Sequence, residues 1–181
     1  MLFRSEIYPH PAQVVHVAAQ LAGWIGVHVT RPLIIGPDSE SAQWVSVVAK
    51  LLGAPSVVAR KERHGDRDVS VFLPEMDQWR DHTPVVLDDI VASGGTLLQT
   101  LRCLRGRTSQ PPVCVAVHGL FAEGVLEKLL VEGAALIVTS NSVITDTSQI
   151  DISKPVAEAM VSLCAAQPTE TEGVVRQNMQ G

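Results

Sequence analysis

The apolar positions of the chain fall into short segments that alternate between helical and strand spacing. Residues 11–26 repeat apolar side chains every three or four positions and predict a first helix, and residues 33–35 form an apolar run typical of a buried strand. Helical spacing returns at 41–52, where Gly53 gives a stop signal before an apolar strand at 56–59. This part of the chain therefore predicts a strand–helix–strand unit after an opening helix.

A charged stretch containing a glycine, residues 61–68, separates this unit from the next. Residues 69–73 then show the two-residue period of a strand, which predicts a flexible β arm that returns through this strand. A continuous apolar run at 84–87 ends in two aspartates and is followed by a glycine turn and a helix over 96–104. The pattern predicts that a second strand–helix crossover begins here.

The remaining apolar segments continue the alternation of strands and helices. We expect strands at 113–117 and 135–139 and helices at 125–131 and 156–163. Such an order produces a parallel sheet with helices on both faces, so we expect an α/β fold with a doubly wound, mostly parallel sheet and the flexible β arm. We expect one domain over 1–166 and, because the composition turns polar and acidic, a disordered tail over 167–181.

Composition and charge exclude several classes of protein. The chain has 181 residues, of which 46% are hydrophobic, which is enough for a substantial core. Its formal net charge of −5 argues against nucleic-acid binding, which normally needs a basic face. No apolar run approaches the roughly 20 residues that cross a bilayer, and three cysteines without metal-ligand spacing fit a reducing compartment. We therefore expect a soluble cytoplasmic protein that binds neither nucleic acid nor membranes.

The segment after the strand at 84–87 carries the best candidate for a site. Ligands of parallel sheets bind outside the carboxyl ends of the strands, where Asp88 and Asp89 are expected. Glycines, hydroxyls and a helix N-terminus suit a phosphate monoester, and these features come together in Ser93, Gly94, Gly95 and Thr96.

Two carboxylates would repel that phosphate. We therefore expect Asp88 and Asp89 to accept hydrogen bonds from ribose hydroxyls or to hold a divalent cation. The alternative is an ordinary glycine turn in which the aspartates cap the following helix.

The sequence from Val85 to Leu97, VVLDDIVASGGTL, resembles the signature of the type I phosphoribosyltransferase fold. The rest of the chain is similar to the C-terminal half of ribose-phosphate diphosphokinases, the synthases that make phosphoribosyl diphosphate and AMP from ATP and ribose 5-phosphate. The resemblance implies a ribose 5-phosphate site formed by Asp88, Asp89, Ala92, Ser93, Gly94, Gly95 and Thr96.

A second matching segment follows the strand at 33–35 and begins Gly36-Pro37-Asp38-Ser39. In the synthases this loop handles diphosphate, so the resemblance implies that Asp38 and Ser39 contact the diphosphate and that Asp38 helps to position Mg²⁺. Many synthases have paired glycines and a basic residue at positions where this chain has Ser39-Glu40 and Gln43-Trp44. The alternative is that Asp38 or Ser39 caps the next helix and Trp44 packs in the core.

A third matching segment, Arg60-Lys61-Glu62-Arg63, resembles the start of the catalytic flexible loop of the synthases. The resemblance implies that Lys61 and Arg63 are catalytic, because cations that close over ATP would stabilise the charge that develops during diphosphate transfer. The alternative is a solvated hairpin in which these cations pair with neighbouring carboxylates.

Two further segments, at His118-Gly119 and Asn141–Ile144, also resemble the family. The first could bring a histidine to the ligand, although a structural role is the commoner one for an isolated histidine, and the second receives no catalytic role.

The resemblance covers only the second half of a typical synthase, and the opening MLFRSEIY gives neither a strand nor a helix cap, which favours a truncated gene product or an expressed fragment. The expected partners are ribose 5-phosphate or phosphoribosyl diphosphate, ATP, Mg²⁺ and further copies of the chain in a homo-oligomer. The alternatives are a free-standing phosphoribosyltransferase of nucleotide metabolism and a non-catalytic subunit that associates with a synthase.

Overall fold

The computed structural model describes residues 12–63 and 69–166, and its chain divides into two compact units. The larger unit is Val17–Ile152. The described part of the smaller unit contains helix α5 (Ser153–Ala166), which is longer at both ends than the helix predicted at 156–163. The predicted tail lies outside the described residues, and the predicted domain limits stay a prediction.

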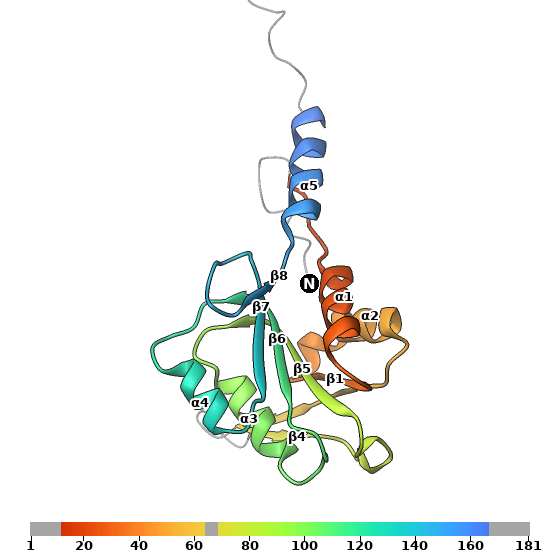
Figure 1. Cartoon of the computed structure of the whole chain (residues 1–181), viewed down its shortest axis with the longest axis vertical. Helices are drawn as coiled ribbons and strands as arrows, with labels where there is room; N and C mark the ends of the chain where they lie inside the picture. Colours follow the sequence, from red (N-terminus) through yellow and green to blue (C-terminus); the bar gives the residue numbers. More distant parts are fainter. Residues whose placement is uncertain (1–11, 64–68, 167–181) are drawn as a thin grey trace, which may run out of the picture. The chain divides into compact units, whose positions relative to one another are not determined.

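A six-stranded sheet forms the centre of the larger unit, with the strand order β2-β1-β5-β6-β7-β8 (Figure 1). All five neighbouring pairs are parallel, which confirms the predicted architecture. The sequence pattern does not predict β8, because this strand has only three residues and two of them are polar. The strands are β1 (Pro32–Gly36), β2 (Ser56–Val58), β5 (Thr83–Val91), β6 (Val113–Gly119), β7 (Leu136–Ser140) and β8 (Ser148–Ile150).

Helices lie on both faces of this sheet (Figure 1). Buried side chains of α3 and α4, among them Leu101 and Leu129, share one core cluster with Val86 and Cys114 of the central strands. The other two helices lie on the opposite side of the sheet and pack against each other. The four helices are α1 (Ala18–His28), α2 (Ala42–Leu52), α3 (Gly95–Leu104) and α4 (Val125–Val131).

The first helix begins later than predicted. The prediction placed it at 11–26, whereas α1 runs from Ala18 to His28 and residues 12–17 have no regular structure. The preceding residues include β-branched Val14, Val15 and Val17, and Val17 at the N-cap supplies no side-chain hydrogen bond. The apolar periodicity therefore extends beyond the segment that is helical.

Strand β5 is longer than the apolar run that predicts it. Val85, Val86 and Leu87 are fully buried, as expected for a central parallel strand. Pairing with β6 continues beyond them to Val91, opposite Gly119. The two aspartates at 88 and 89 therefore belong to the paired strand, whereas the prediction placed them after its end.

Two short strands, β3 (Arg60–Arg63) and β4 (Val69–Phe72), form an antiparallel sheet of their own. In the register of this β3–β4 hairpin, Lys61 pairs with Val71. The returning strand of the predicted β arm is thereby confirmed, and its connecting residues 64–68 lie outside the described part. Within the residues that the structure covers, no helix has the length and apolar character needed to span a membrane.

Substitution of Gly53 tests whether the backbone at the end of α2 is left-handed. It adopts φ +61°, and a Cβ there would meet no atom within 4 Å, so only the left-handed backbone opposes a side chain. We expect Gly53→Ala to lower the free energy of unfolding by about 1 kcal/mol. Urea denaturation measures this change.

The matched control is Gly23→Ala. Gly23 is an exposed residue in the middle of α1, where a Cβ also meets nothing within 4 Å. Because its backbone is helical, this variant should gain about 0.5–1 kcal/mol. Equal effects of the two substitutions would contradict the assignment of the left-handed turn.

Candidate functional site

The candidate site lies where the strand order reverses. β1 is followed in the chain by its outer neighbour β2, whereas β5 is followed by β6 on the other side, so the connections after β1 and β5 run in opposite directions. Such a switch point leaves a crevice beyond the carboxyl ends of the strands and is where doubly wound sheets bind ligands. The two predicted site segments begin within the carboxyl ends of these strands, at Gly36 of β1 and at Asp88 of β5, and continue into the loops that follow.

Gly94 shapes the second loop. It adopts φ +71° at the N-cap of α3, and a Cβ there would lie 2.7 Å from Cγ1 of Val125. Both the backbone conformation and the close neighbour therefore require glycine. The cap supplies no side-chain hydrogen bond, so the first N–H groups of α3 have no side-chain capping partner at Gly94, as in helix termini that bind anions.

The loop encloses a hollow of about 140 Å³, lined by Asp88 and residues 90–97. Its outer wall is held by the β6–α4 connection: Leu120 N–H donates to the Val91 carbonyl (2.9 Å) and Ala122 N–H donates to the Ala92 carbonyl (3.0 Å). The predicted loop residues 92–96 thus meet around one hollow. The fold of the chain alone therefore shapes this hollow.

The two aspartates are positioned partly by each other. Asp89 N–H donates to Oδ1 of Asp88 (3.0 Å), and Ile90 N–H donates to Oδ1 of Asp89 (2.8 Å). The pKa of Asp88 is raised from 3.8 to about 7, mainly by burial and to a smaller extent by the negative charges of Asp89 and Asp38, while the hydrogen bond from the Asp89 N–H lowers it. The three aspartates from the two loops are therefore close enough to interact.

Asp38 caps the 3₁₀ turn Ser39–Ser41. Its Oδ1 accepts from the Ser41 N–H (3.2 Å), while the Ser41 hydroxyl donates to the Asp38 carbonyl (2.6 Å). A Cβ at Gly36 would collide with this buried hydroxyl, so the loop is tightly closed. Asp38 thus caps the turn that precedes α2, whose own N-cap is Ser41, and Trp44 is only partly buried and is not a core residue.

Lys61 and Arg63 lie on β3, in the hairpin that is separate from the main sheet. The structure describes the backbone of these two residues only, and it does not bring them to the hollow through any described contact. Their catalytic role stays a prediction.

The sequence does not predict a series of hydrogen bonds that lies at the same edge of the sheet. His118 Nδ1 lies 2.8 Å from Oγ of Ser142, and that hydroxyl donates to the Val117 carbonyl (2.9 Å). If the single serine proton goes to the Val117 carbonyl, Nδ1 is the donor and Nε2 is left as an acceptor in the neutral ring. No sequence signal joins residues 24 positions apart, although the register of β6 beside β5 places His118 next to Ile90.

Asn141, to which the sequence analysis assigns no catalytic role, has a structural one. Its side chain donates to Oδ1 of Asp151 (2.8 Å) and accepts from the Ile152 N–H (2.9 Å). These bonds close the turn that carries β8, so Asn141 needs no ligand to explain it.

Carboxylates are the side chains that could hold a metal here. Residues 12–63 and 69–166 contain no group of three histidine, cysteine or acidic side chains arranged to bind an ion by themselves. The carboxylates of Asp38, Asp88 and Asp89 are of the chemical type that hard divalent cations prefer, and a cation there would offset the part of the raised pKa of Asp88 that repulsion adds to burial. Mg²⁺ is commonly held by one or two carboxylates together with phosphate oxygens and water.

The chain is similar to known proteins in both sequence and structure. The phosphoribosyl transferase domain model matches residues 4–149. The ribose-phosphate pyrophosphokinase of Sulfurisphaera tokodaii is 31% identical over 137 residues, covering 74% of this chain and 46% of that protein. The corresponding protein of Pyrococcus abyssi is 29% identical over 147 residues, covering 81% and 51%.

Solved structures give the same fold. The phosphoribosylpyrophosphate synthetase of Mycobacterium smegmatis superposes with a TM-score of 0.72 at 21% identity, covering 90% of this chain and 55% of that one. A Giardia lamblia adenine phosphoribosyltransferase complexed with 9-deazaadenine has a TM-score of 0.54 at 18% identity, covering 68% of this chain and 77% of the other.

The switch-point crevice, the glycine-capped helix and the paired aspartates thus belong to a type I phosphoribosyltransferase fold. The chain is a member of the phosphoribosyl transferase domain family, and its sequence relatives identify it with the ribose-phosphate pyrophosphokinase branch. It spans about half the length of the curated relatives that it matches.

Asp88 provides a pH test of the site. Its pKa is higher in the folded chain than in the unfolded one, so the folded state holds the proton more tightly and loses stability as the pH rises from about 4 to about 7. Asp88→Asn cannot ionise, and its amide oxygen can still accept from the Asp89 N–H. We expect wild type to lose roughly 1–3 kcal/mol relative to this variant over that interval.

Urea unfolding at closely spaced pH values measures this difference. Asp81→Asn, at the exposed amino-terminal approach to β5, is the control and should give a curve parallel to that of wild type. Parallel curves for Asp88→Asn and wild type would contradict a raised pKa.

Proposed function

We propose that the loop from Asp88 to Thr96 binds the ribose 5-phosphate moiety of a phosphoribosyl ligand. The observation that carries the proposal is the position of Gly94, whose left-handed backbone begins α3 at a hollow that Asp88 also lines. The helix N–H groups and the hydroxyls of Ser93 and Thr96 suit the phosphate. Asp88 and Asp89 suit the ribose hydroxyls, which are hydrogen-bond donors.

The other loop suits the diphosphate end of the ligand. Asp38 lies close enough to raise the pKa of Asp88, so a cation bound between the two loops would be held by Asp38, Ser39 and phosphate oxygens. When bound, Mg²⁺ would neutralise phosphate charge. Because Asp38 already accepts from the Ser41 N–H through Oδ1, the turn that it caps would keep its carboxylate oriented.

We infer that the reaction is the one named by the sequence relatives, transfer of diphosphate from ATP to ribose 5-phosphate. A bond forms between the ribose 1-oxygen and the β-phosphorus of ATP. The bond from the β-phosphorus to the oxygen that bridges the α- and β-phosphorus breaks, and the hydroxyl proton is released as AMP leaves. Lys61 and Arg63 would stabilise the charge on the departing AMP. The chain matches about half of each relative, so the complete reaction is a proposal. We also propose that the chain works as a cytoplasmic homo-oligomer.

Ligand binding tests the site independently of turnover. We expect calorimetry with ribose 5-phosphate to detect binding to wild type in the presence of Mg²⁺. Gly94→Ala should weaken this binding at least about tenfold by displacing the loop from Val125, and Asp89→Ala should weaken it about tenfold by removing a charged acceptor. Gly23→Ala and Asp81→Ala, which lie outside the site, should retain the wild-type affinity.

The absence of binding to wild type would refute the proposed site. Equal affinity of wild type and Gly94→Ala would refute the role of the loop even if the ligand binds elsewhere.

The reaction itself is tested by incubating the chain with ATP and ribose 5-phosphate and measuring AMP and phosphoribosyl diphosphate. Formation of both products in equal amounts supports the proposed transfer. Binding without products supports a non-catalytic subunit, and exchange of pyrophosphate with a purine or pyrimidine base supports a free-standing phosphoribosyltransferase. Either of the last two results would replace the diphosphokinase assignment.

A further inference from the structure

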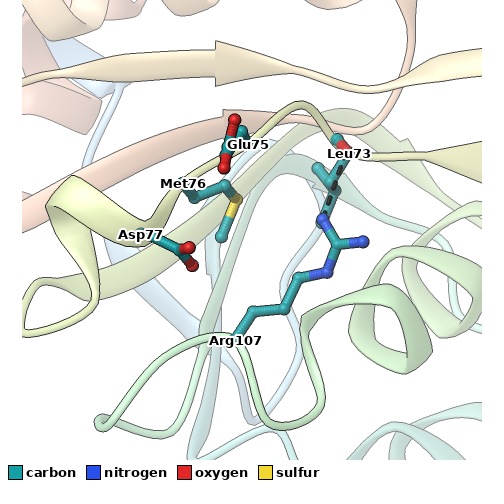
Figure 2. A pocket seen from close by; sticks show the side chains of 5 residues that line it. All are labelled: Leu73, Glu75, Met76, Asp77 and Arg107. Carbon is teal, nitrogen blue, oxygen red and sulfur yellow. Dashed lines mark hydrogen bonds between the residues drawn. The ribbon is translucent and has the colours of Figure 1, made fainter.

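The end of α3 that is remote from the candidate site holds the base of the β3–β4 hairpin. Arg107, in the connection after α3, donates from Nη1 to the carbonyls of Leu73 (3.2 Å) and Pro74 (3.4 Å), the residues that follow β4. Figure 2 shows its side chain reaching across a cavity of about 300 Å³ to Leu73. A guanidinium can satisfy two adjacent carbonyls at once, so it fixes this piece of backbone more firmly than a single neutral donor would.

The carboxylates around this cavity do not account for Arg107. Glu75 and Asp77 line the cavity together with Met76, which is 2% exposed (Figure 2). The described hydrogen bonds of Arg107 go to backbone carbonyls and not to these carboxylates. The two carboxylates would also oppose an anion attracted by the arginine, so the contacts favour a clamp on the backbone over a ligand site.

A second contact joins α3 to the same strand. The thiol of Cys103 donates to the Val71 carbonyl (3.1 Å), and Val71 pairs with Lys61 in the hairpin. Val71 and Leu73 are buried in the core cluster that also contains Leu101 of α3. Packing and the Cys103 thiol therefore hold β4 to α3, and the Arg107 guanidinium, just beyond α3, holds the two residues that follow β4.

α3 thus has the phosphate loop at one end and the hairpin anchor at the other. Its ten residues span about 15 Å, and a helix of this length is a stiff spacer. We propose that Arg107 is a positioning residue, which fixes β4, and through it the paired strand with Lys61, at a set distance from the phosphate loop. The part of this inference that concerns Lys61 rests on the proposed function, whereas the anchoring of β4 does not.

Amide hydrogen exchange of the full chain tests the anchor. In Arg107→Ala we expect the amides of Val69–Leu73 to exchange roughly three- to tenfold faster than in wild type, because the opening of this strand becomes easier. Arg107→Lys keeps a charged donor and should restore part of the protection. Arg105→Ala is the matched control, because Arg105 lies two residues away and pairs instead with Glu132 (2.7 Å).

Equal exchange in Arg107→Ala and Arg105→Ala would overturn the proposal. If Arg107→Ala does not fold, Arg107→Lys and Arg107→Gln supply the comparison, and wild-type exchange in both would overturn it equally.

Ribose 5-phosphate titration separates this proposal from the proposed function. Arg107→Ala should bind the sugar phosphate within about twofold of wild type, because its contacts lie at the far end of α3. A loss of affinity of tenfold or more would place its effect in the loop and refute a positioning role for the hairpin. If wild type does not bind the sugar phosphate, the proposed function fails while the exchange data still decide whether Arg107 anchors β4.

Discussion

The contact between Gly94 and Val125 governs the carboxyl edge of the sheet. No Cβ fits between this backbone and the Val125 side chain, so the first turn of α4 limits how the chain can enter α3. The entry in turn determines where the N–H groups of α3 point. A packing constraint between two helices, each anchored in the core cluster, thereby sets the geometry of a polar site.

The site has an electrostatic cost that the core must offset. Asp88 continues a strand whose preceding residues are completely buried, and its carboxyl is drawn into that environment next to two further carboxylates. Ionisation is consequently opposed by desolvation and by repulsion. Hydroxyl donors or a cation placed beside this carboxylate would offset both penalties, so any ligand that brings them would also change the stability of the fold.

Sequence reasoning predicts the fold well because the buried strands and amphipathic helices leave strong periodic signals. The loop from Ala92 to Thr96 is predictable for a different reason, because its glycines and hydroxyls are consecutive in the sequence. The pattern fails where tertiary pairing decides the structure: β5 extends through polar Asp88 because β6 pairs with it, and β8 forms only beside β7. The His118–Ser142 bond and the Arg107 clamp join distant residues that carry no local signature.

The separation of the β3–β4 hairpin from the six-stranded sheet has an evolutionary consequence. Substitutions and length changes between its two strands leave the ladder of the central sheet unaltered, so they need not disturb the core on which folding depends. This freedom does not extend to Val71 and Leu73, which belong to the core cluster. A fold with this layout can vary the hairpin without altering the six-stranded sheet or the loop that follows β5.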